Sequence, residues 1–391
     1  MITKRIYLDH NASAPLVPAA RAAMLDALEI DANPSSVHGE GRQARRLVEE
    51  ARRAVAALVN AKAEHVVFTS GATEAATTLL TPGWTMGRSP LAFSRLYVSA
   101  AEHPCLLSGG RFAPDAITIL PVLESGLLDL AALSDALKAH DRSKGLPLVA
   151  IHAANNETGV IQPVDAIGAL ARAAGATLIV DAVQAAGRIA VDISSGYGDF
   201  LILSSHKIGG PKGAGAIVGA SDLMMPGALV RGGGQEKGHR AGTENVAAIA
   251  GFGAAARIVR EGLAAIHDVE ALRDAFEEAV LELIPDAEIH GRGAPRLPNT
   301  VFFTIPGLKA ETAQIAFDLA GIALSAGSAC SSGKVGPSHV LKAMGKGEDA
   351  GALRVSIGAR TGPDDLDAFK TALGKIAQDG PWQNRGQTAK Q

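Results

Sequence analysis

Short apolar runs alternate with helical stretches along this chain, and this pattern constrains the possible fold more than any other feature. Five runs carry most of the signal: HVVF (65–68), LYVSA (96–100), LVAIHA (148–153), TLIV (177–180) and LIL (201–203). Continuous apolar strands, as opposed to strands that alternate with polar residues, are typical of parallel sheets buried on both faces. The sequence therefore predicts an α/β domain with a mostly parallel sheet covered by helices.

The pattern changes near Val246. A long helical stretch runs to about residue 284, where we expect a break near its middle, and shorter strands and helices follow it. A length of 391 residues accommodates two domains. We predict a large domain over residues 15–258, a smaller α+β domain formed by residues 1–14 and 259–380, and a disordered polar tail over residues 381–391.

Composition excludes several classes of function. The formal net charge is -3 and aromatic residues make up 4%, which disfavours a nucleic-acid-binding protein. No apolar run is long enough to span a bilayer, and the N-terminus lacks the pattern of a signal peptide, so we expect a cytoplasmic protein without a membrane partner. Two cysteines are too few for a disulfide framework, which agrees with a reducing compartment.

Polar side chains follow each of the five apolar strands. They occur in residues 69–74, 102–103, 155–157, 181–184 and 204–207. Each group alone has an ordinary explanation, such as a helix cap or a structural histidine. Ligands in parallel α/β sheets bind beyond the carboxyl ends of the strands, however, so five such ends together indicate a binding site.

Lys207 decides which site this is. A lysine at the inner end of a strand loses hydration, so its pKa falls and a neutral amine becomes available to form a Schiff base. A Schiff-base lysine, a phosphate cradle and a carboxylate for a pyridinium nitrogen together indicate pyridoxal phosphate. In this interpretation Asp181 faces the ring nitrogen, Gln184 the phenolic oxygen and His103 the ring face, while Thr73, Ser204 and His206 contact the phosphate.

The chain resembles the cysteine desulfurases of iron–sulfur cluster assembly, which belong to the class V aminotransferase-like group of fold type I pyridoxal phosphate enzymes. The matching stretches are YLDHNASAP, NPSSVHGEGRQA, VFTSGATEA, AEHPCLL, NNETGVIQPV, VDAVQAAG, SSHKIGGPKGAGAI, RAGTENV, SAGSACSSG and ALRVSIGART. The resemblance implies a seven-stranded type of sheet in the large domain and a small domain that carries a mobile cysteine loop.

The resemblance also assigns roles to individual residues. Lys207 matches the Schiff-base lysine, and Thr243 matches a threonine that reaches the phosphate of the neighbouring subunit, which implies a homodimer. Asn33, Asn156 and Arg354 match positions that bind the substrate, with Arg354 holding its carboxylate. The positions implied to bind the cofactor are Ala72, Thr73, His103, Asn156, Asp181, Gln184, Ser204, His206, Lys207 and Thr243.

Cys330 lies in the glycine- and serine-rich stretch SAGSACSSGKVG, which predicts a flexible loop. The resemblance identifies Cys330 as the nucleophile that takes sulfur from L-cysteine, becomes a persulfide and leaves L-alanine, with His103 as an acid or base. The resemblance also implies a sulfur acceptor or iron–sulfur scaffold protein as partner. It implies no resident metal, and leaves open a contact between Cys330 and a nascent cluster. Cys105 matches no family role and is interpreted as structural.

Several positions depart from the commonest family pattern. Ser205 stands where glycine is frequent, and Ala101 stands where threonine is common. No departure removes a catalytic group. Two alternatives therefore stay open beside the desulfurase: a selenocysteine lyase or another class V aminotransferase-like enzyme, and a non-catalytic paralogue that acts as a binding subunit.

Overall fold

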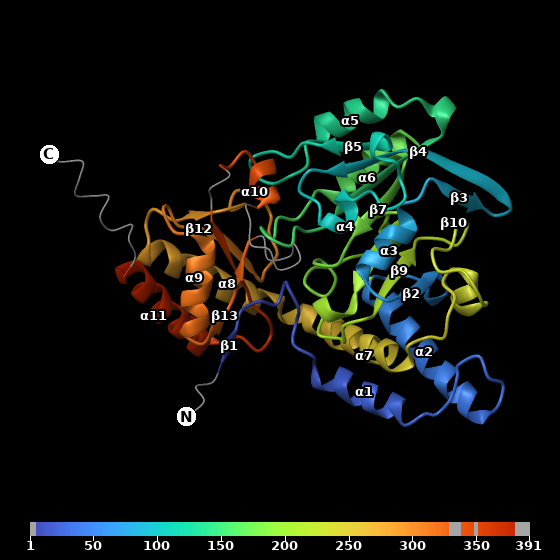
Figure 1. The fold of residues 1–391 in the computed structure, drawn as a ribbon, viewed down its shortest axis with the longest axis horizontal. Coiled ribbons are helices and arrows are strands. Elements are labelled where there is room, and N and C mark those ends of the chain that lie inside the picture. Colours follow the sequence, from blue (N-terminus) through green and yellow to red (C-terminus); the bar gives the residue numbers. More distant parts are fainter. Residues whose placement is uncertain (1–4, 328–337, 348–350, 380–391) are drawn as a thin grey trace.

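The computed structural model describes residues 5–327, 338–347 and 351–379, which gather around two sheets (Figure 1). The larger sheet has nine strands among these residues. They are β2 (Val66–Thr69), β3 (Gly83–Met86), β4 (Ser89–Ser99), β5 (Ile117–Leu120), β6 (Leu146–His152), β7 (Thr177–Asp181), β8 (Phe200–Ser204), β9 (Gly215–Gly219) and β10 (Met224–Pro226).

The order of the larger sheet is β10-β3-β4-β6-β7-β8-β9-β2, and β5 pairs with the free edge of β4. The pairs β5–β4, β4–β6, β6–β7 and β7–β8 are parallel, whereas β9 is antiparallel to both of its neighbours. The prediction of a mostly parallel sheet is therefore confirmed for the seven strands from β5 to β2. The β3–β4 hairpin and β10 extend this sheet in an antiparallel manner.

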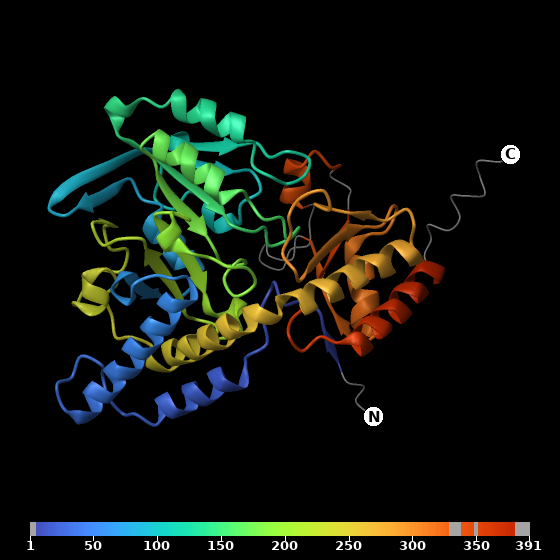
Figure 2. The ribbon, with the colours of Figure 1, turned by 180° about the vertical axis from the view of Figure 1, so that it is seen from behind.

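Helices cover both faces of the larger sheet, as the continuous apolar strands predict (Figures 1 and 2). Along β6, Val149 and Ile151 face one apolar core, and Leu148 and Ala150 face the other. The first core includes α2 (Gly39–Leu58), α5 (Leu130–Lys138), α6 (Val164–Ala173) and α7 (Val246–Gly262), with α1 (Pro18–Leu28) packed beside α7, whereas the second includes α3 (Ala72–Leu79) and α4 (Pro104–Leu107).

The second sheet is antiparallel and has its own apolar core. Phe276, Phe317 and Phe369 meet in that core, with ring centroids 5.1 and 5.4 Å apart around Phe369. The strands, in spatial order, are β11 (Glu288–Ile289), β12 (Thr300–Thr304), β15 (Ala352–Ser356) and β14 (Ser325–Ala326), and the helices are α8 (Ile266–Leu283), α9 (Ala310–Leu319), α10 (His339–Ala343) and α11 (Pro363–Asp379).

Two segments connect the cores. The predicted break in the long helix is confirmed, because a short 3-10 turn at Leu263–Ala265 separates α7 from α8. Near the N-terminus, β1 (Ile6–Tyr7) pairs with β13 (Ile322–Ala323), and the chain then runs toward the larger sheet. The domain boundaries given above stay a prediction.

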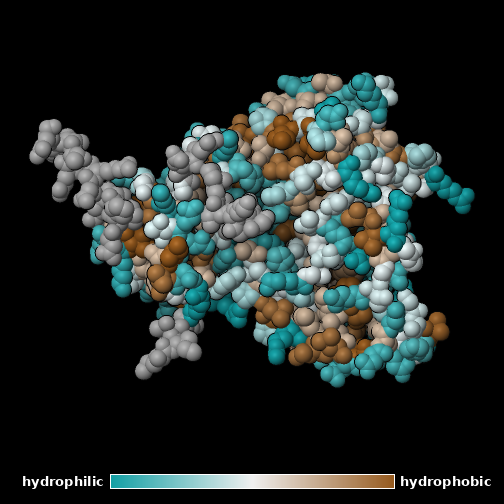
Figure 3. All heavy atoms as spheres, in the orientation of Figure 1, coloured by the Kyte–Doolittle hydropathy of each residue, from teal (hydrophilic) through white to brown (hydrophobic). Residues whose placement is uncertain are grey.

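The surface mixes polar and apolar residues. The face in Figure 3 shows hydrophobic patches scattered between hydrophilic ones. Among the residues that the structure describes, no helix combines the length and the apolar character needed to span a membrane.

Candidate active site

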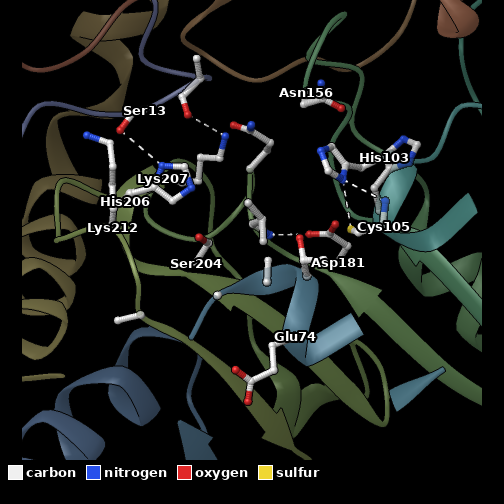
Figure 4. A pocket seen from close by; sticks show the side chains of 18 of the residues that line it. Ser13, Glu74, His103, Cys105, Asn156, Asp181, Ser204, His206, Lys207 and Lys212 are labelled. Carbon is white, nitrogen blue, oxygen red and sulfur yellow. Dashed lines mark hydrogen bonds between the residues drawn. The ribbon is translucent and has the colours of Figure 1, made fainter. Parts of the chain in front are cut away.

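A cavity of about 720 Å³ opens at the carboxyl ends of β6, β7 and β8 and at the start of α3 (Figure 4). The polar groups that follow the apolar strands meet here, as the strand order requires. The predicted site residues that line it are Ala72, Thr73, His103, Asn156, Asp181, Gln184, Ser204, His206 and Lys207.

Lys207 lies in a 3-10 turn, Ser205–Lys207, directly after β8. Its half-buried amine donates hydrogen bonds to the backbone oxygens of Asn11 (2.7 Å) and Ala12 (2.9 Å). The side chain thus points into the cavity and against the N-terminal segment, as Figure 4 shows. This position places an amine within the cavity that also contains the Asp181 carboxyl group.

Asp181 ends β7 and is 7% exposed. Its Oδ1 accepts a hydrogen bond from the backbone N–H of Val183 at 2.9 Å. Burial raises the pKa of Asp181 to about 6, and nearby Glu102 adds to this effect, whereas the Val183 bond, His152 and Lys207 oppose it. A buried carboxyl group in this state is suited to pairing with a cationic ring nitrogen.

A second buried pair lies next to Asp181, and sequence reasoning gave it no role. His152 is the register partner of Asp181 in the β6–β7 ladder. Its Nδ1 lies 2.9 Å from Oε1 of Glu102, although the two groups are not aligned as a hydrogen bond. Burial is the largest single influence and lowers the pKa of His152, but the interactions with Glu102 and the charge of Asp181 together raise it overall. The only signal for this pair in the sequence was that polar residues occur at the ends of the strands.

His103 caps the N-terminus of α4. Its Nδ1 accepts the backbone N–H of Cys105 at 3.2 Å and lies 3.0 Å from the Cys105 Sγ. Burial lowers the pKa of His103 to about 4, and the charges of Lys207 and His339 add to the effect. The ring is therefore neutral at pH 7, and because Nδ1 acts as an acceptor, its proton is on Nε2.

Cys105 is a buried free cysteine that lines the same cavity. Burial raises the pKa of its thiol, and the negative charges of Asp181 and Glu102 raise it further. The thiol is thus protonated at neutral pH and is a poor nucleophile. This agrees with the structural role that the sequence suggested.

The start of α3 provides backbone N–H groups to the cavity. The N-cap is Gly71, and no side chain caps the helix, although Ser70 and Thr73 were candidates for that role. The N–H of Ser70 bonds to Glu74, which in turn pairs with Arg240 at 3.0 Å. A helix N-terminus without a side-chain cap is suited to binding a phosphate.

Close packing keeps this helix start in place. A Cβ at Gly215 in β9 would lie 2.6 Å from the Gly71 carbonyl carbon, so only glycine lets the strand approach the turn. Ser204 and His206 line the same cavity, and His206 Nδ1 lies 3.3 Å from the Ser13 hydroxyl. Burial lowers the pKa of His206 to about 4, with added repulsion from Lys207 and Lys212.

Arg354 lies in β15 of the second sheet and is 1% exposed. It donates to the backbone oxygen of Asn156 and to Oδ1 of Asp9, each at 2.8 Å. Both partners line the cavity, so Arg354 sits directly behind its wall. Asp9 lies inside the quoted YLDHNASAP stretch, but the sequence alone did not single it out.

Besides Arg354, two predicted residues, Asn33 and Thr243, are not among those that line the cavity. Asn33 is exposed in the connection between α1 and α2, where its side chain accepts the N–H of Ser35. Thr243 is exposed and lines a smaller cavity of about 180 Å³ that shares Ser70 and Gly213 with the main one. Cys330 lies outside the described residues.

Comparisons with known proteins identify the family of this chain. The family model "Aminotransferase class-V" matches residues 6–369. A protein of Cereibacter sphaeroides named cysteine desulfurase is 39% identical over 386 residues, which is 95% of this chain and 96% of that protein.

Solved structures show the same fold. A NifS-like protein from Rickettsia africae ESF-5 matches with a TM-score of 0.86 and 33% identity, over 96% of this chain and 99% of that one. A structure described as SspA in complex with cysteine matches with a TM-score of 0.71 and 28% identity, over 90% and 98% of the two chains. Because the family model spans almost the whole sequence, this chain belongs to the class V aminotransferase family.

Proposed function

We propose that this protein is a cysteine desulfurase that uses pyridoxal 5'-phosphate to convert L-cysteine to L-alanine and holds the sulfur as a persulfide on Cys330. The observation that carries the proposal is the placement of the Lys207 amine and the buried Asp181 carboxyl group in one cavity. The relatives named cysteine desulfurase, which match over nearly the full length, support the choice of substrate.

The described residues fit the cofactor of this family. A cavity of about 720 Å³ is within the usual range for cofactor sites, which is roughly 300–1,000 Å³. Lys207 would hold the cofactor's aldehyde carbon, Asp181 its ring nitrogen, and the start of α3 its phosphate. When bound, the cofactor supplies an electron sink that eases removal of the substrate α-proton.

The side chains around the cavity then have distinct tasks. The Lys207 amine would accept the α-proton of the substrate. The Asp181 carboxylate stabilises a positive charge in a buried setting, where the interaction is stronger than in water. His103 holds a proton at Nε2, from which it can donate a hydrogen bond to a group in the cavity.

Recognition of the substrate carboxylate falls to Arg354. Its guanidinium lies behind the cavity wall between Asp9 and the Asn156 carbonyl. A guanidinium has five N–H donors and can form a charge-assisted bond to a carboxylate. Asn156 belongs to both the cofactor and the substrate parts of the site.

Cys330 completes the reaction. Its thiolate attacks the substrate sulfur, a new S–S bond forms, and the carbon–sulfur bond breaks with its electron pair left on the carbon skeleton. Protonation of that skeleton yields alanine. The persulfide then passes its outer sulfur to the thiolate of an acceptor protein, which regenerates the Cys330 thiolate.

A homodimer belongs to the same proposal. Thr243 lines the small cavity that shares Ser70 and Gly213 with the main cavity, so it lies next to the proposed phosphate end. Thr243 is exposed in the single chain, and in the dimer we expect it to contact the neighbouring subunit's cofactor phosphate.

The test is an assay of sulfide and alanine from L-cysteine on the purified protein. The chain has two cysteines, so Cys330→Ala and Cys105→Ala separate their roles. We expect Cys330→Ala to lose sulfide release but keep the absorbance of the bound cofactor, and Cys105→Ala to keep the persulfide that alkylation traps at residue 330.

Other results would point elsewhere. Full turnover without the Cys330 thiol would favour a selenocysteine lyase or an aminotransferase. A protein that takes up no cofactor would favour a non-catalytic binding subunit.

A further inference from the structure

A buried arginine lies against the site, and the proposed reaction assigns it no role. Arg188 follows β7 and is 8% exposed. Arg188 lines an apolar cavity of about 540 Å³, and two of its hydrogen-bond partners, Gln184 and Lys207, line the main cavity. Among the described residues, its hydrogen bonds all end on neutral oxygens, so this buried cation has no carboxylate partner there.

The strongest of these contacts go to one residue, Gln184. The Arg188 guanidinium donates to the Gln184 side-chain oxygen Oε1, and also to its backbone oxygen at 3.0 Å. At the other end of the same amide, Nε2 of Gln184 donates to the Asn11 backbone oxygen at 3.0 Å.

These two contacts allow only one orientation of the Gln184 amide. A guanidinium carries donors and no acceptor, so a flipped amide would bring its NH₂ group against the donors of Arg188. The flip would also turn Oε1 toward the carbonyl oxygen of Asn11, where two acceptors repel each other. Nε2 has two N–H groups, and the one that Asn11 does not use is the one that the amide can offer to the cavity that Gln184 lines.

The same guanidinium reaches the segment that carries the lysine. It donates to the backbone oxygens of Lys207 at 3.4 Å and of His10 at 3.5 Å. The charged and titratable groups that face it are Lys207, Arg354 and His10. Burial lowers the pKa of Arg188 to about 9 and that of His10 to about 4, so at pH 7 the arginine is charged and the histidine is neutral.

A buried cation without a counter-ion costs stability, so its presence needs a functional reason. We propose that Arg188 is a positioning residue that fixes the Gln184 amide so that its N–H donates to the phenolic oxygen of bound pyridoxal phosphate. The inference rests on the cofactor part of the proposed function and does not depend on which substrate the enzyme uses.

The experiment is a pH titration of the visible absorbance of the cofactor-bound protein. It compares wild type with Arg188→Met, Arg188→Lys, Gln184→Ala and the double variant Arg188→Met/Gln184→Ala. Arg172→Met is the matched control, because Arg172 is exposed and donates to a backbone carbonyl at Gly196 away from the cavity. Cofactor stoichiometry and melting temperature are measured for each protein.

A hydrogen bond to the phenolic oxygen favours its ionised form, so its loss raises the pH midpoint of the absorbance change. We expect Arg188→Met to raise the midpoint by about one pH unit, and Arg188→Lys to raise it less. The decisive result is the double variant: Arg188→Met should add no further shift once Gln184 is alanine.

Two results would overturn the inference. One is an unchanged midpoint in Arg188→Met. The other is the same shift with and without Gln184, which would mean that Arg188 acts by its charge alone. Should Arg188→Met fail to fold, Arg188→Gln takes its place in the cycle. If wild type shows no desulfurase activity but its cofactor absorbance titrates and shifts as expected, the proposed substrate is contradicted and the role of Arg188 is not. If wild type binds no cofactor, both the proposed function and the role of Arg188 are overturned.

Discussion

The two walls of the cavity are built differently. The proposed cofactor wall is formed by residues that follow strands of the larger sheet, such as Thr73, Asp181 and Lys207. The proposed substrate wall contains Asp9 from the N-terminal segment, and Arg354 from the second sheet lies directly behind it. The first wall depends on strand pairing within one sheet, whereas the second depends on how two separate apolar cores pack together.

This difference predicts that substitutions can impair cofactor binding and substrate binding separately. Changes in the cofactor wall should alter the bound cofactor and its absorbance. Changes in the substrate wall should leave the absorbance intact and weaken only the interaction with the substrate. The predictions below test that separation, beginning with the largest expected effect.

Replacing Lys207 with alanine should have the largest effect. The variant loses the only amine that the proposed mechanism uses, so the protein should lose both its covalent cofactor absorbance and all measurable turnover. Absorbance spectra before and after borohydride reduction, with mass spectrometry of the peptide, provide the measurement. Lys212→Ala is the control, because Lys212 lines the same cavity from an exposed position and should keep the covalent bond. A covalent adduct retained in Lys207→Ala would contradict the assignment.

Asp181→Asn should lower kcat by on the order of 10²–10³-fold, because a neutral amide cannot hold the ring nitrogen in its charged form. Steady-state kinetics and the absorbance spectrum should both change. Asp199→Asn is the control, since Asp199 also accepts a backbone N–H of the same sheet but lies near the opposite end of β7. Equal losses in the two variants would indicate a structural role only.

Arg354→Lys should raise KM for cysteine about 10- to 100-fold, because lysine cannot form the two-pronged contact with a carboxylate. The absorbance of the bound cofactor should stay unchanged, since Arg354 belongs to the substrate wall. A spectrum as altered as that of Asp181→Asn would show that the two walls are not separable.

The smallest effect concerns pH and the N-terminal segment. Burial and the charges of Arg188 and Arg360 lower the pKa of His10 from 6.5 to about 4. The unfolded chain therefore binds more protons than the folded protein between pH 6.5 and 4, and stability falls as pH falls through that window. On acidification, His10→Gln should therefore lose about 1–3 kcal/mol less of its free energy of unfolding than the wild type does.

Urea unfolding of the cofactor-free protein at pH 7 and pH 4.5 measures this effect. The exposed His267 provides the matched control variant, His267→Gln. An unchanged pH dependence in His10→Gln would place the acid sensitivity elsewhere.

Much of the cofactor wall could be predicted from local patterns. Asp181 and Lys207 each stand directly after a continuous apolar strand, and parallel strands bring their carboxyl ends to one edge. The β3–β4 hairpin was not predicted, because its residues carry no strong alternation and its pairing with β10 joins segments about 140 residues apart.

The roles of Arg188, Asp9 and His152 were out of reach for the same physical reason. Arg188 is informative only because Gln184, His10 and Lys207 surround it, and a guanidinium's partners cannot be read from its neighbours in sequence. The role of Asp9 depends on its ion pair with Arg354, which lies 345 positions away in the sequence.

By itself, the sequence determined most of the central strands and helices and which polar groups meet at the edge of the sheet. Periodicity and strand polarity are local properties, so a linear reading is enough for them. Only the tertiary structure decided how the N-terminal segment and the second sheet close the cavity, and which side chains hold others in place. Those contacts depend on how the two apolar cores pack together, and no short stretch of sequence encodes the distance between the two cores.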